Sequence, residues 1–333
     1  MTTEDARAIS LVAVIRRDPN RPVSDIDRFL ALAVPSFERF LGDGLVEELV
    51  VITPERDVAE ATRRIPPALG IPVRVVDEKD VIPHLDHDAA GWMKQQVIKL
   101  AAPAVVRTPW FITLDADVVA ARPVDREFLL PGGRALWQQE SAGAHMDWWR
   151  NSARVLRSGL VIDSDQPVFG VTPAIMHAPS LVALGERIER EHPGMHWTRT
   201  LMDLADEGWT EYTLYWTHVL DTGAADALYT ASGDGDRPYS LNGSVWVGDH
   251  LSSRALRDQL ADVFSPDAPH AFFVFQSNLD RPLAETVALV RPLLGGHGPT
   301  RAEKRLWARR ARTHRARSVL LTWRARLRRL IRG

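Results

Sequence analysis

The chain has 333 residues, of which 45% are hydrophobic and 25% charged, the composition of an ordinary globular protein. It has no cysteine, which excludes disulfides and thiolate metal sites. No segment has the roughly 20 consecutive apolar residues of a membrane-spanning helix, and the N-terminus lacks the basic start and apolar core of a signal peptide. We therefore expect a cytoplasmic protein that forms one large α/β domain with additions or two smaller domains.

The net charge of −2 conceals a strong asymmetry along the chain. Residues 301–333 contain 13 Lys or Arg and one acidic residue, Glu303, and so carry a net charge of +12. The remaining residues carry −14. An acidic body with a basic tail predicts that the tail contacts something anionic.

Strand and helix patterns alternate in the first third of the chain. Short apolar runs predict strands at 9–15, 49–53 and 72–76. Between the first two, Ser24 is a candidate N-cap for a helix that runs to about residue 41 and is broken or kinked at Pro35. This alternation predicts a doubly wound, mainly parallel sheet with right-handed crossovers.

The segment after the first predicted strand, RRDPNRP, contains no glycine. It therefore has neither the GxGxxG pattern of dinucleotide-binding folds nor a phosphate-binding P-loop, which disfavours a nicotinamide dehydrogenase and a P-loop kinase. A sugar nucleotidyltransferase shares this kind of sheet but needs a basic, glycine-rich loop at the same point, so it is disfavoured as well.

A polar loop at 83–90 contains His84, Asp86, His87 and Asp88. Their spacing matches no standard zinc pattern. We interpret the segment as a loop near a site and not as a metal centre.

A helix is predicted over 92–102, because Trp92 and later apolar residues recur at helical spacing. Lys94, Gln95 and Lys99 lie on its other faces. Each lysine either occupies a solvated helix face or contacts a ligand.

The next predicted strand, WFITL at 110–114, is apolar throughout, as in strands that a parallel sheet buries on both faces. Asp115 and Asp117 follow it directly. Open α/β sheets bind ligands at the carboxyl ends of their strands, and residues i and i+2 of a strand point the same way. Mg²⁺ and Mn²⁺ prefer carboxylate oxygens and usually carry substrate phosphates as further ligands. The pair is therefore a candidate metal–diphosphate site, although acidic residues are also common in turns.

The second half of the chain mixes short strands with helices. It begins with a strand that ends near Glu140 and a polar, aromatic segment, HMDWW at 145–149. Periodicity predicts a strand at 169–175 and helices at 180–190 and 197–220.

A turn is expected at 232–236 (SGDGD), and mixed strands extend to Asn278. The sequence GGHGP that begins at Gly295 is typical of the end of a domain. We therefore expect one domain over residues 1–295 and a basic helical tail over 296–333.

An ordered set of motifs runs through residues 9–280. Its members are GWMKQQVIKL at 91–100, LDAD at 114–117, GVTPAIM at 170–176, WTEYTLYW at 209–216 and FFVFQSN at 272–278. In this order they resemble an uncharacterised bacterial family of glycosyltransferase-like proteins, related in pattern to nucleotide-sugar transferases of the GT-A fold. The resemblance implies a GT-A-like sheet, a nucleoside-diphospho-sugar donor, and Mn²⁺ or Mg²⁺ bound at the Asp-x-Asp.

The resemblance also suggests roles for single residues. Asp117 is expected to bind the metal directly, and Asp115 to bind it through water or to hold the ribose. Lys99 and Lys94 are candidates to neutralise phosphate or to position the base, and Gln95 to contact the ligand or a neighbouring strand. Asp117 is thus a metal-ligand assignment, Asp115 is both a metal-ligand and a substrate-binding assignment, and the others are substrate-binding assignments.

Glu211 is the candidate general base, because an acid in this place deprotonates the acceptor in many transferases of similar fold. The alternative is an acid that complements the dipole at a helix N-terminus. Trp209 and Tyr212, beside it, are candidate substrate contacts, although aromatic residues are more often core. His270 is the candidate third metal ligand, with His250 as the other histidine available for that role.

The tail ends in SVLLTWRARLRRLIR at 318–332, with apolar residues on one helical face and arginines on the other. Basic amphipathic helices with a tryptophan suit an anionic membrane surface. The alternatives are that the tail packs on the acidic body of the same chain or on a partner. No recognised nucleic-acid-binding module accompanies it, so nucleic acid is not expected as a partner.

Together these features predict a metal-dependent glycosyltransferase of the hexosyltransferase type. It would move a sugar from a nucleoside-diphosphate sugar to a hydroxyl of a glycan or lipid-linked acceptor, in cell-surface glycan or glycolipid synthesis. We expect it in the cytoplasm, with peripheral contact at the inner face of the cell membrane. The alternative is a non-catalytic scaffold of the same fold that binds a nucleotide sugar or a glycan.

Overall fold

The computed structural model of the chain describes residues 9–18, 21, 23–42, 44–65, 70–85, 91–231, 244–246, 249–268, 270–279 and 281–314. The predicted turn at 232–236 and the predicted amphipathic helix at 318–332 lie outside these residues. So do Asp86, His87 and Asp88 of the polar loop.

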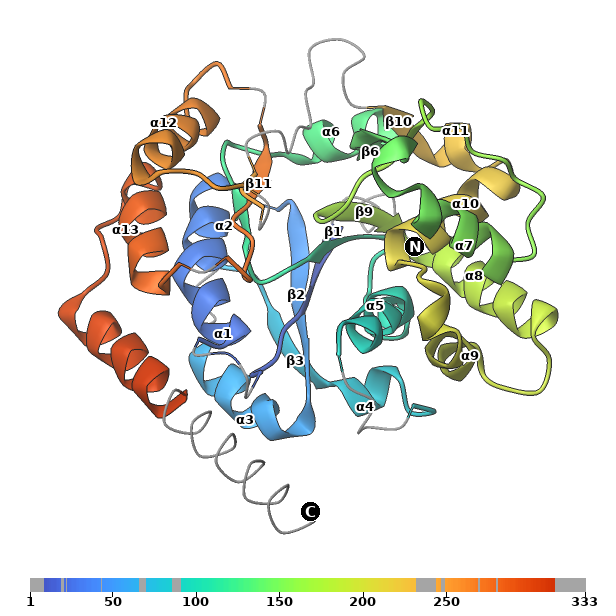
Figure 1. Ribbon diagram of the computed structural model, residues 1–333, viewed down its shortest axis with the longest axis horizontal. Coiled ribbons are helices and arrows are strands. Elements are labelled where there is room, and N and C mark those ends of the chain that lie inside the picture. The colour runs from blue at the N-terminus through green and yellow to red at the C-terminus, as the bar shows by residue number, and fades with distance from the viewer. Residues whose placement is uncertain are drawn as a thin grey trace, which may run out of the picture.

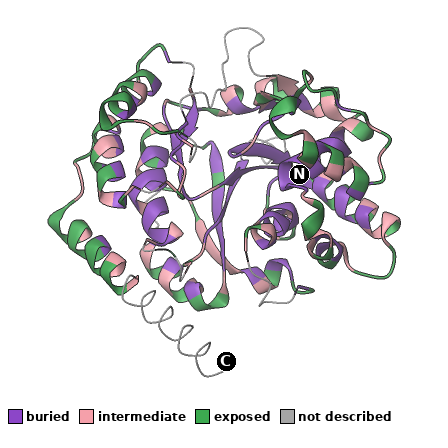
Figure 2. Cartoon of the chain, viewed as in Figure 1, coloured by how far each residue is buried: buried purple, intermediate pink, exposed green. Residues whose placement is uncertain are grey.

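A five-stranded sheet with the order β3-β2-β1-β4-β9 forms the centre of the molecule (Figure 1). Its strands are β1 (Ile9–Val14), β2 (Val46–Thr53), β3 (Val73–Asp77), β4 (Trp110–Leu114) and β9 (Ala174–His177). The first four pair in parallel, and β9 pairs antiparallel with β4. The predicted α/β architecture with a mainly parallel sheet is therefore confirmed. Every residue of β1 and β4 is buried, because helices cover both faces of these central strands (Figure 2).

Three two-stranded sheets surround the central one. They are formed by β5 (Val118–Ala120) with β11 (Phe272–Val274), β6 (Ala135–Trp137) with β10 (Tyr229–Ala231), and β7 (Gln139–Ser141) with β8 (Pro167–Phe169). The antiparallel pair of β5 and β11 matters most for the site. It returns a segment from near the end of the folded body to the end of β4.

The helices lie in two groups on either side of the sheet. The chain forms α1 (Asp25–Arg28), α2 (Val34–Phe40), α3 (Glu55–Arg64), α4 (Glu78–Val81), α5 (Trp92–Ala101), α6 (Arg126–Leu129), α7 (Met146–Val155), α8 (Ala178–Glu191), α9 (Trp197–Asp203), α10 (Glu211–Asp221), α11 (Ala225–Leu228), α12 (Ser253–Val263) and α13 (Leu283–Leu293). Figure 1 shows α1, α2 and α3 on one side of β1 and β2, with α12 and α13 outside them. Helices α5, α7, α8, α9 and α10 lie on the other side.

The first predicted helix begins as expected and then changes type. Ser24 is its N-cap, and its hydroxyl accepts a hydrogen bond from the Asp27 N–H. A π-helical segment, Phe29–Ala33, separates α1 from α2. The α-helical hydrogen-bonding pattern is therefore interrupted just before Pro35. This proline occupies the first turn of α2, where a missing N–H is tolerated.

Two predicted elements in the second half are wrong as single units. The strand expected at 169–175 is divided, because β8 ends at Phe169 and β9 begins at Ala174. The helix expected at 197–220 is divided into α9 and α10. Gly208 adopts a left-handed conformation with φ of 77° between them, and the Thr210 side chain then caps the N-terminus of α10.

The first part of the basic tail is a helix, residues 301–314, that packs on the body of the chain. Trp307 is buried in an apolar cluster with residues of α12 and α13. Arg310 pairs with the fully buried carboxylate of Asp27, and with Glu60 at 3.1 Å. Asp27 also pairs with Arg64 at 2.6 Å. Among the described residues, no helix is long and apolar enough to cross a membrane.

Candidate functional site

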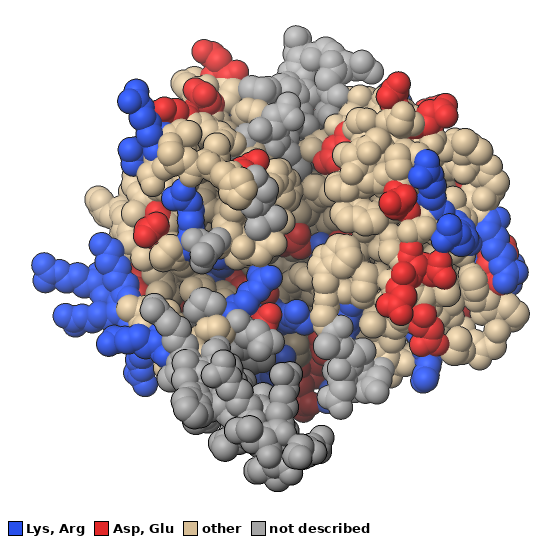
Figure 3. All heavy atoms as spheres, in the orientation of Figure 1, with Lys and Arg blue, Asp and Glu red and all other residues tan. Residues whose placement is uncertain are grey.

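A cleft of about 1130 Å³ opens at the carboxyl ends of β1 and β4. Val14 and Arg16 reach it from the end of β1, and Asp115 and Asp117 from the end of β4. Figure 3 shows a hollow in the middle of this face, with both acidic and basic atoms in it. The position agrees with the rule that parallel α/β sheets bind ligands beyond the carboxyl ends of their strands.

The two aspartates of the Asp-x-Asp differ in their surroundings. The Asp115 side chain is 31% exposed and faces the cleft. Asp117 is only 4% exposed, and its carboxylate accepts a hydrogen bond from the Ser277 N–H. The Phe275 N–H donates to the Asp117 carbonyl at 3.1 Å. One carboxylate is therefore open to a ligand, while the other is held in the cleft wall by the segment after β11.

Lys99 connects this edge of the sheet to two helices. Its buried ammonium group donates to Asp115 Oδ1 at 2.8 Å, to Glu211 Oε1 at 2.9 Å and to the Tyr212 hydroxyl at 3.2 Å. The Tyr212 hydroxyl also lies 3.2 Å from Thr113 Oγ1. A buried charge is tolerated only when it is paired and hydrogen-bonded, and Lys99 meets that condition through Asp115, which follows β4, and through two residues of α10.

Burial and the neighbouring charges shift the pKa values of these groups. Burial raises the pKa of Glu211, and Lys99 opposes that shift. Burial would lower the pKa of Lys99, but Asp115 and Glu211 outweigh it and hold this pKa well above its usual value. Burial and the nearby Asp115 raise the pKa of Asp117 to about 7, against the opposing charge of Arg28.

Gln95 and Gln96 occupy the middle of the α5 face that lines the cleft. Gln95 Nε2 donates to the Val14 carbonyl at 2.9 Å, and Gln96 Oε1 accepts from the Glu211 N–H at 3.0 Å. Lys94 is different, because its ammonium group pairs with Glu78 at 2.5 Å and it is not among the residues that line the cleft. Gln95 and Lys99 therefore lie in the lining of the cleft, and Lys94 does not.

Trp209, which the sequence suggested as a substrate contact, lies in the core of the structure. It is fully buried and lies outside the cleft lining. Its indole N–H donates to the Leu204 carbonyl at 3.0 Å, which closes the turn between α9 and α10. A tryptophan beside a candidate acid has the same sequence signature in a core as in a site.

His270 precedes β11, at the end of the strand pair opposite to the end that lies nearest Asp117. The antiparallel register pairs Phe272 with Ala120 and Val274 with Val118, so the chain leaves β11 toward Asp117 only after Val274. His270 does not line the cleft, and His250 is exposed beside Asp249.

Among the described residues, no three His, Cys, Asp or Glu side chains are grouped to hold a metal ion. Asp115 and Asp117 are a donor set that suits Mg²⁺ or Mn²⁺ only when substrate phosphates and water complete the coordination.

Sequence reasoning missed the aromatic residues at the mouth of the cleft. Trp92 was expected in the apolar seam of its helix, but it is 55% exposed and lines the cleft. Trp148 and His145 line it as well. The polar and aromatic composition of the segment HMDWW was the available signal, since an amphipathic helix with adjacent tryptophans exposes one of them.

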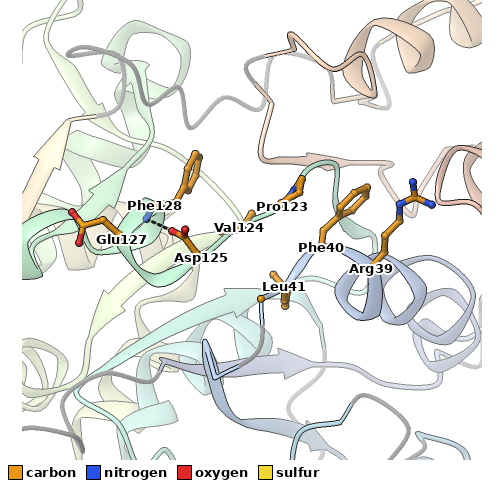
Figure 4. Close-up of a pocket in the computed structure, with 9 residues that line it drawn as sticks. Arg39, Phe40, Leu41, Pro123, Val124, Asp125, Glu127 and Phe128 are labelled. Atoms are coloured by element: carbon orange, nitrogen blue, oxygen red, sulfur yellow. Dashed lines mark hydrogen bonds between the residues drawn. The ribbon is translucent and has the colours of Figure 1, made fainter.

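A second, smaller cavity of about 400 Å³ lies between the end of α2 and the segment before α6 (Figure 4). Phe40, Val124 and Phe128 contribute to its lining. Asp125 accepts a hydrogen bond from the Phe128 N–H at 2.7 Å and so caps α6. This arrangement explains Asp125 structurally, and the cavity has no cluster of groups suited to catalysis.

The model of a family of unknown function (DUF6492) matches residues 6–296 of this chain. No curated protein matches the sequence. Among solved structures, mouse xyloside xylosyltransferase 1 in its apo form matches at 15% identity, covering 83% of this chain and 100% of that chain, with a TM-score of 0.47. The galactosyltransferase LgtC in complex with donor and acceptor sugar analogues matches at 9% identity, covering 90% of this chain and 100% of that chain, with a TM-score of 0.46. Similarities at this level do not assign a function.

The raised pKa of Asp117 predicts how the stability of the metal-free protein depends on pH. The folded state keeps this proton up to about pH 7, whereas an unfolded aspartate loses it near its usual pKa of 3.8. The contribution of Asp117 to stability is therefore lost as the pH rises through that range. Asp117→Asn should have a higher Tm than the wild-type protein at pH 8, and a smaller difference at pH 5.

Thermal melts at both pH values in the presence of a chelator measure this effect. The exposed Asp165 provides the control, since Asp165→Asn should melt like the wild type at both. An Asp117→Asn protein that is less stable than wild type at pH 8 would contradict the prediction.

Proposed function

We propose that this chain, which belongs to the family of unknown function DUF6492, is a metal-dependent glycosyltransferase with a GT-A-like fold. The proposed reaction transfers a sugar from a nucleoside-diphosphate sugar to a hydroxyl acceptor. The observation that carries the proposal is one cleft at the carboxyl ends of β1 and β4 that contains Asp115, Asp117, Lys99 and Glu211. These groups match the two needs of such a transfer, which are stabilisation of a departing diphosphate and activation of a hydroxyl.

Asp115 and Asp117 are the residues that would hold Mn²⁺ or Mg²⁺. The bound ion would supply positive charge to neutralise the leaving diphosphate. Arg21 lies in the same wall and donates to Ser277 Oγ at 3.1 Å, which places a second cationic group beside the segment that contacts Asp117. The Asp117 side of the cleft is therefore the proposed donor side.

Glu211 is the proposed general base for the acceptor hydroxyl. It lies at the first residue of α10, is 4% exposed and lines the cleft. Burial raises its pKa, which makes its carboxylate a stronger base than an exposed glutamate. Lys99 contacts Oε1 and so fixes the orientation of the carboxyl group. These features favour a role in proton transfer over a simple helix-dipole contact.

A thermal-shift screen tests the donor site directly. Nucleoside diphosphates and common nucleotide sugars are added with and without Mn²⁺, because a ligand that binds only the native state raises its stability. We expect a metal-dependent rise in Tm with at least one nucleotide, and no such rise for Asp117→Ala. Asp165→Ala should respond like the wild type. The absence of a shift with every nucleotide would argue for a scaffold that has lost the donor site.

Glu211→Gln tests the role of the base. The amide keeps the size of the side chain and a hydrogen-bonding oxygen for Lys99, but it cannot accept the proton. Turnover of the nucleotide sugar identified in the screen should fall by about 10²- to 10⁴-fold, the usual contribution of general base catalysis, while nucleotide affinity stays near the wild-type value. Glu207→Gln, at an exposed position, is the matched control. Turnover within a few-fold of wild type would place the base elsewhere.

The basic tail supports a second part of the proposal, contact with an anionic membrane. The helix at 301–314 is docked through Trp307 and Arg310, and its outward-facing basic residues are exposed (Figure 3). These are Arg301, Lys304, Arg305, Arg309 and Arg312. Basic clusters gain about 1 kcal/mol per Lys or Arg near an anionic leaflet. Such contact would suit a lipid-linked acceptor.

Co-sedimentation with vesicles measures this contact. The full chain should bind vesicles that contain phosphatidylserine and not vesicles of phosphatidylcholine alone, and binding should weaken as salt is raised. Removal of residues 315–333 together with Arg305→Glu and Arg309→Glu should abolish it, whereas Arg254→Glu, an 89% exposed arginine on α12, should not. Removal of the whole tail from residue 301 is a poor test, because it would uncover the core around Trp307. Equal binding by the full chain and the first variant would overturn the proposal.

A further inference from the structure

We propose that the mouth of the cleft is a carbohydrate-binding subsite in which a sugar ring of a glycan acceptor stacks on Trp148, His145 and Trp92. We name these three side chains the aromatic platform. The inference rests on the proposed transferase function and specifies its acceptor as a glycan. It also assigns a ligand to a part of the cleft that the donor and the metal do not use.

The platform is formed by three separate elements. The rings of His145 and Trp148 stack with centroids 4.0 Å apart and an interplanar angle of 13°. The rings of Trp92 and Trp148 lie 6.2 Å apart at 44°. His145 precedes α7, Trp148 belongs to its first turn, and Trp92 begins α5. The turn that ends at His145, the first turn of α7 and the start of α5 therefore bring three rings together at the cleft mouth.

The exposure of Trp92 is unusual for this chain. Five large apolar residues are exposed among those that the structure describes, and Trp92 is the one that lines the cleft. Leaving an indole ring in water forgoes the free energy of burying its large apolar surface. A ligand that covers this ring on binding recovers that free energy, which favours a ligand with an apolar face.

Helix α5 relates the platform to the proposed reacting groups. Gln95 and Gln96 lie three and four residues after Trp92, Lys99 lies three residues after Gln96, and all four line the cleft along one helix face. Seven residues of α helix separate Trp92 from Lys99 by about 10 Å along the axis. The platform therefore lies outward from the Lys99 contacts with Asp115 and Glu211, on the path of a chain-like acceptor that enters the cleft.

Two polar residues of the same cleft lining, which closely precede His145 in the chain, suit hydroxyls better than phosphates. Glu140 lines the cleft, and its carboxylate accepts hydrogen bonds from Gln138 Nε2 at 3.2 Å and the Val171 N–H at 3.3 Å. A carboxylate accepts hydrogen bonds from sugar hydroxyls but repels phosphate. Pyranose rings combine apolar C–H faces with hydroxyls at the rim, and so match a cleft lining that has the aromatic platform together with Glu140 and Gln138. A phosphate-bearing nucleotide matches the arginine-containing donor side instead.

Sugar binding in the absence of nucleotide and metal tests the inference. We suggest titrations by ligand-observed NMR with three pairs: methyl β-galactoside and lactose, methyl β-glucoside and cellobiose, and methyl α-glucoside and maltose. At least one disaccharide should bind, and more tightly than its monosaccharide partner. Trp148→Ala should weaken that binding at least about tenfold, the scale of losing one well-placed aromatic contact with its buried area. Trp148→Phe should restore most of it.

Phe128→Ala is the matched control, because it removes an aromatic ring from the lining of the second cavity (Figure 4). It should bind the sugars like the wild type. Asp117→Ala should also bind them while losing the metal-dependent nucleotide response, so failure of the donor site and failure of the platform are distinguishable. Three results would overturn the inference: binding of none of the sugars, wild-type affinity in Trp148→Ala, or loss of nucleotide binding instead of sugar binding in that variant.

Discussion

The site depends on one buried cation. Lys99 lies on α5, while its partners Asp115 and Glu211 follow β4 and begin α10. Without the lysine, the buried carboxylate of Glu211 would have no cation beside it, which costs several kcal/mol. With it, three elements that are far apart in the sequence are fixed around one point at the bottom of the cleft. The same lysine contacts Asp115 Oδ1 at 2.8 Å, while Asp115 still lines the cleft.

The other side of the site depends on the return of the chain after β11. The Ser277 N–H contacts the Asp117 carboxylate, and the Phe275 N–H contacts the Asp117 carbonyl. Asp117 is therefore held by backbone groups about 160 residues away in sequence. This explains why two aspartates separated by a single residue have different surroundings, one exposed to the cleft and the other enclosed by the wall.

The sequence was sufficient for those features that local pattern controls. The apolar runs at β1 and β4, the cap at Ser24 and the position of the Asp-x-Asp after a buried strand all follow from residues within a few positions of each other. Trp92 and Trp209 show the limit of prediction from local sequence pattern. Both are tryptophans near candidate site residues, yet one is exposed at the cleft mouth and the other is fully buried. Their difference arises from which helices pack beside them, which one sequence does not specify.

His270 shows the same limit for strands. Its distance from Asp117 depends on the register between β5 and β11, and a change of register would move it along the strand pair. Nothing in the segment before FFVFQSN specifies that register. The sequence suggested that Lys99 neutralises phosphate or positions the base, but it could not show that the helix face of Lys99 meets Glu211.

A chain of contacts links the basic tail to the metal-binding edge of the cleft. Arg310 pairs with Asp27 on α1, and the next residue, Arg28, donates to the Ser277 carbonyl at 3.3 Å. Ser277 in turn contacts Asp117. Helix 301–314, α1 and the segment after β11 are therefore packed as one unit beside the donor side of the cleft, while the aromatic platform belongs to the helices across the sheet. If the tail rests on a membrane, these contacts fix the direction in which the cleft faces that membrane.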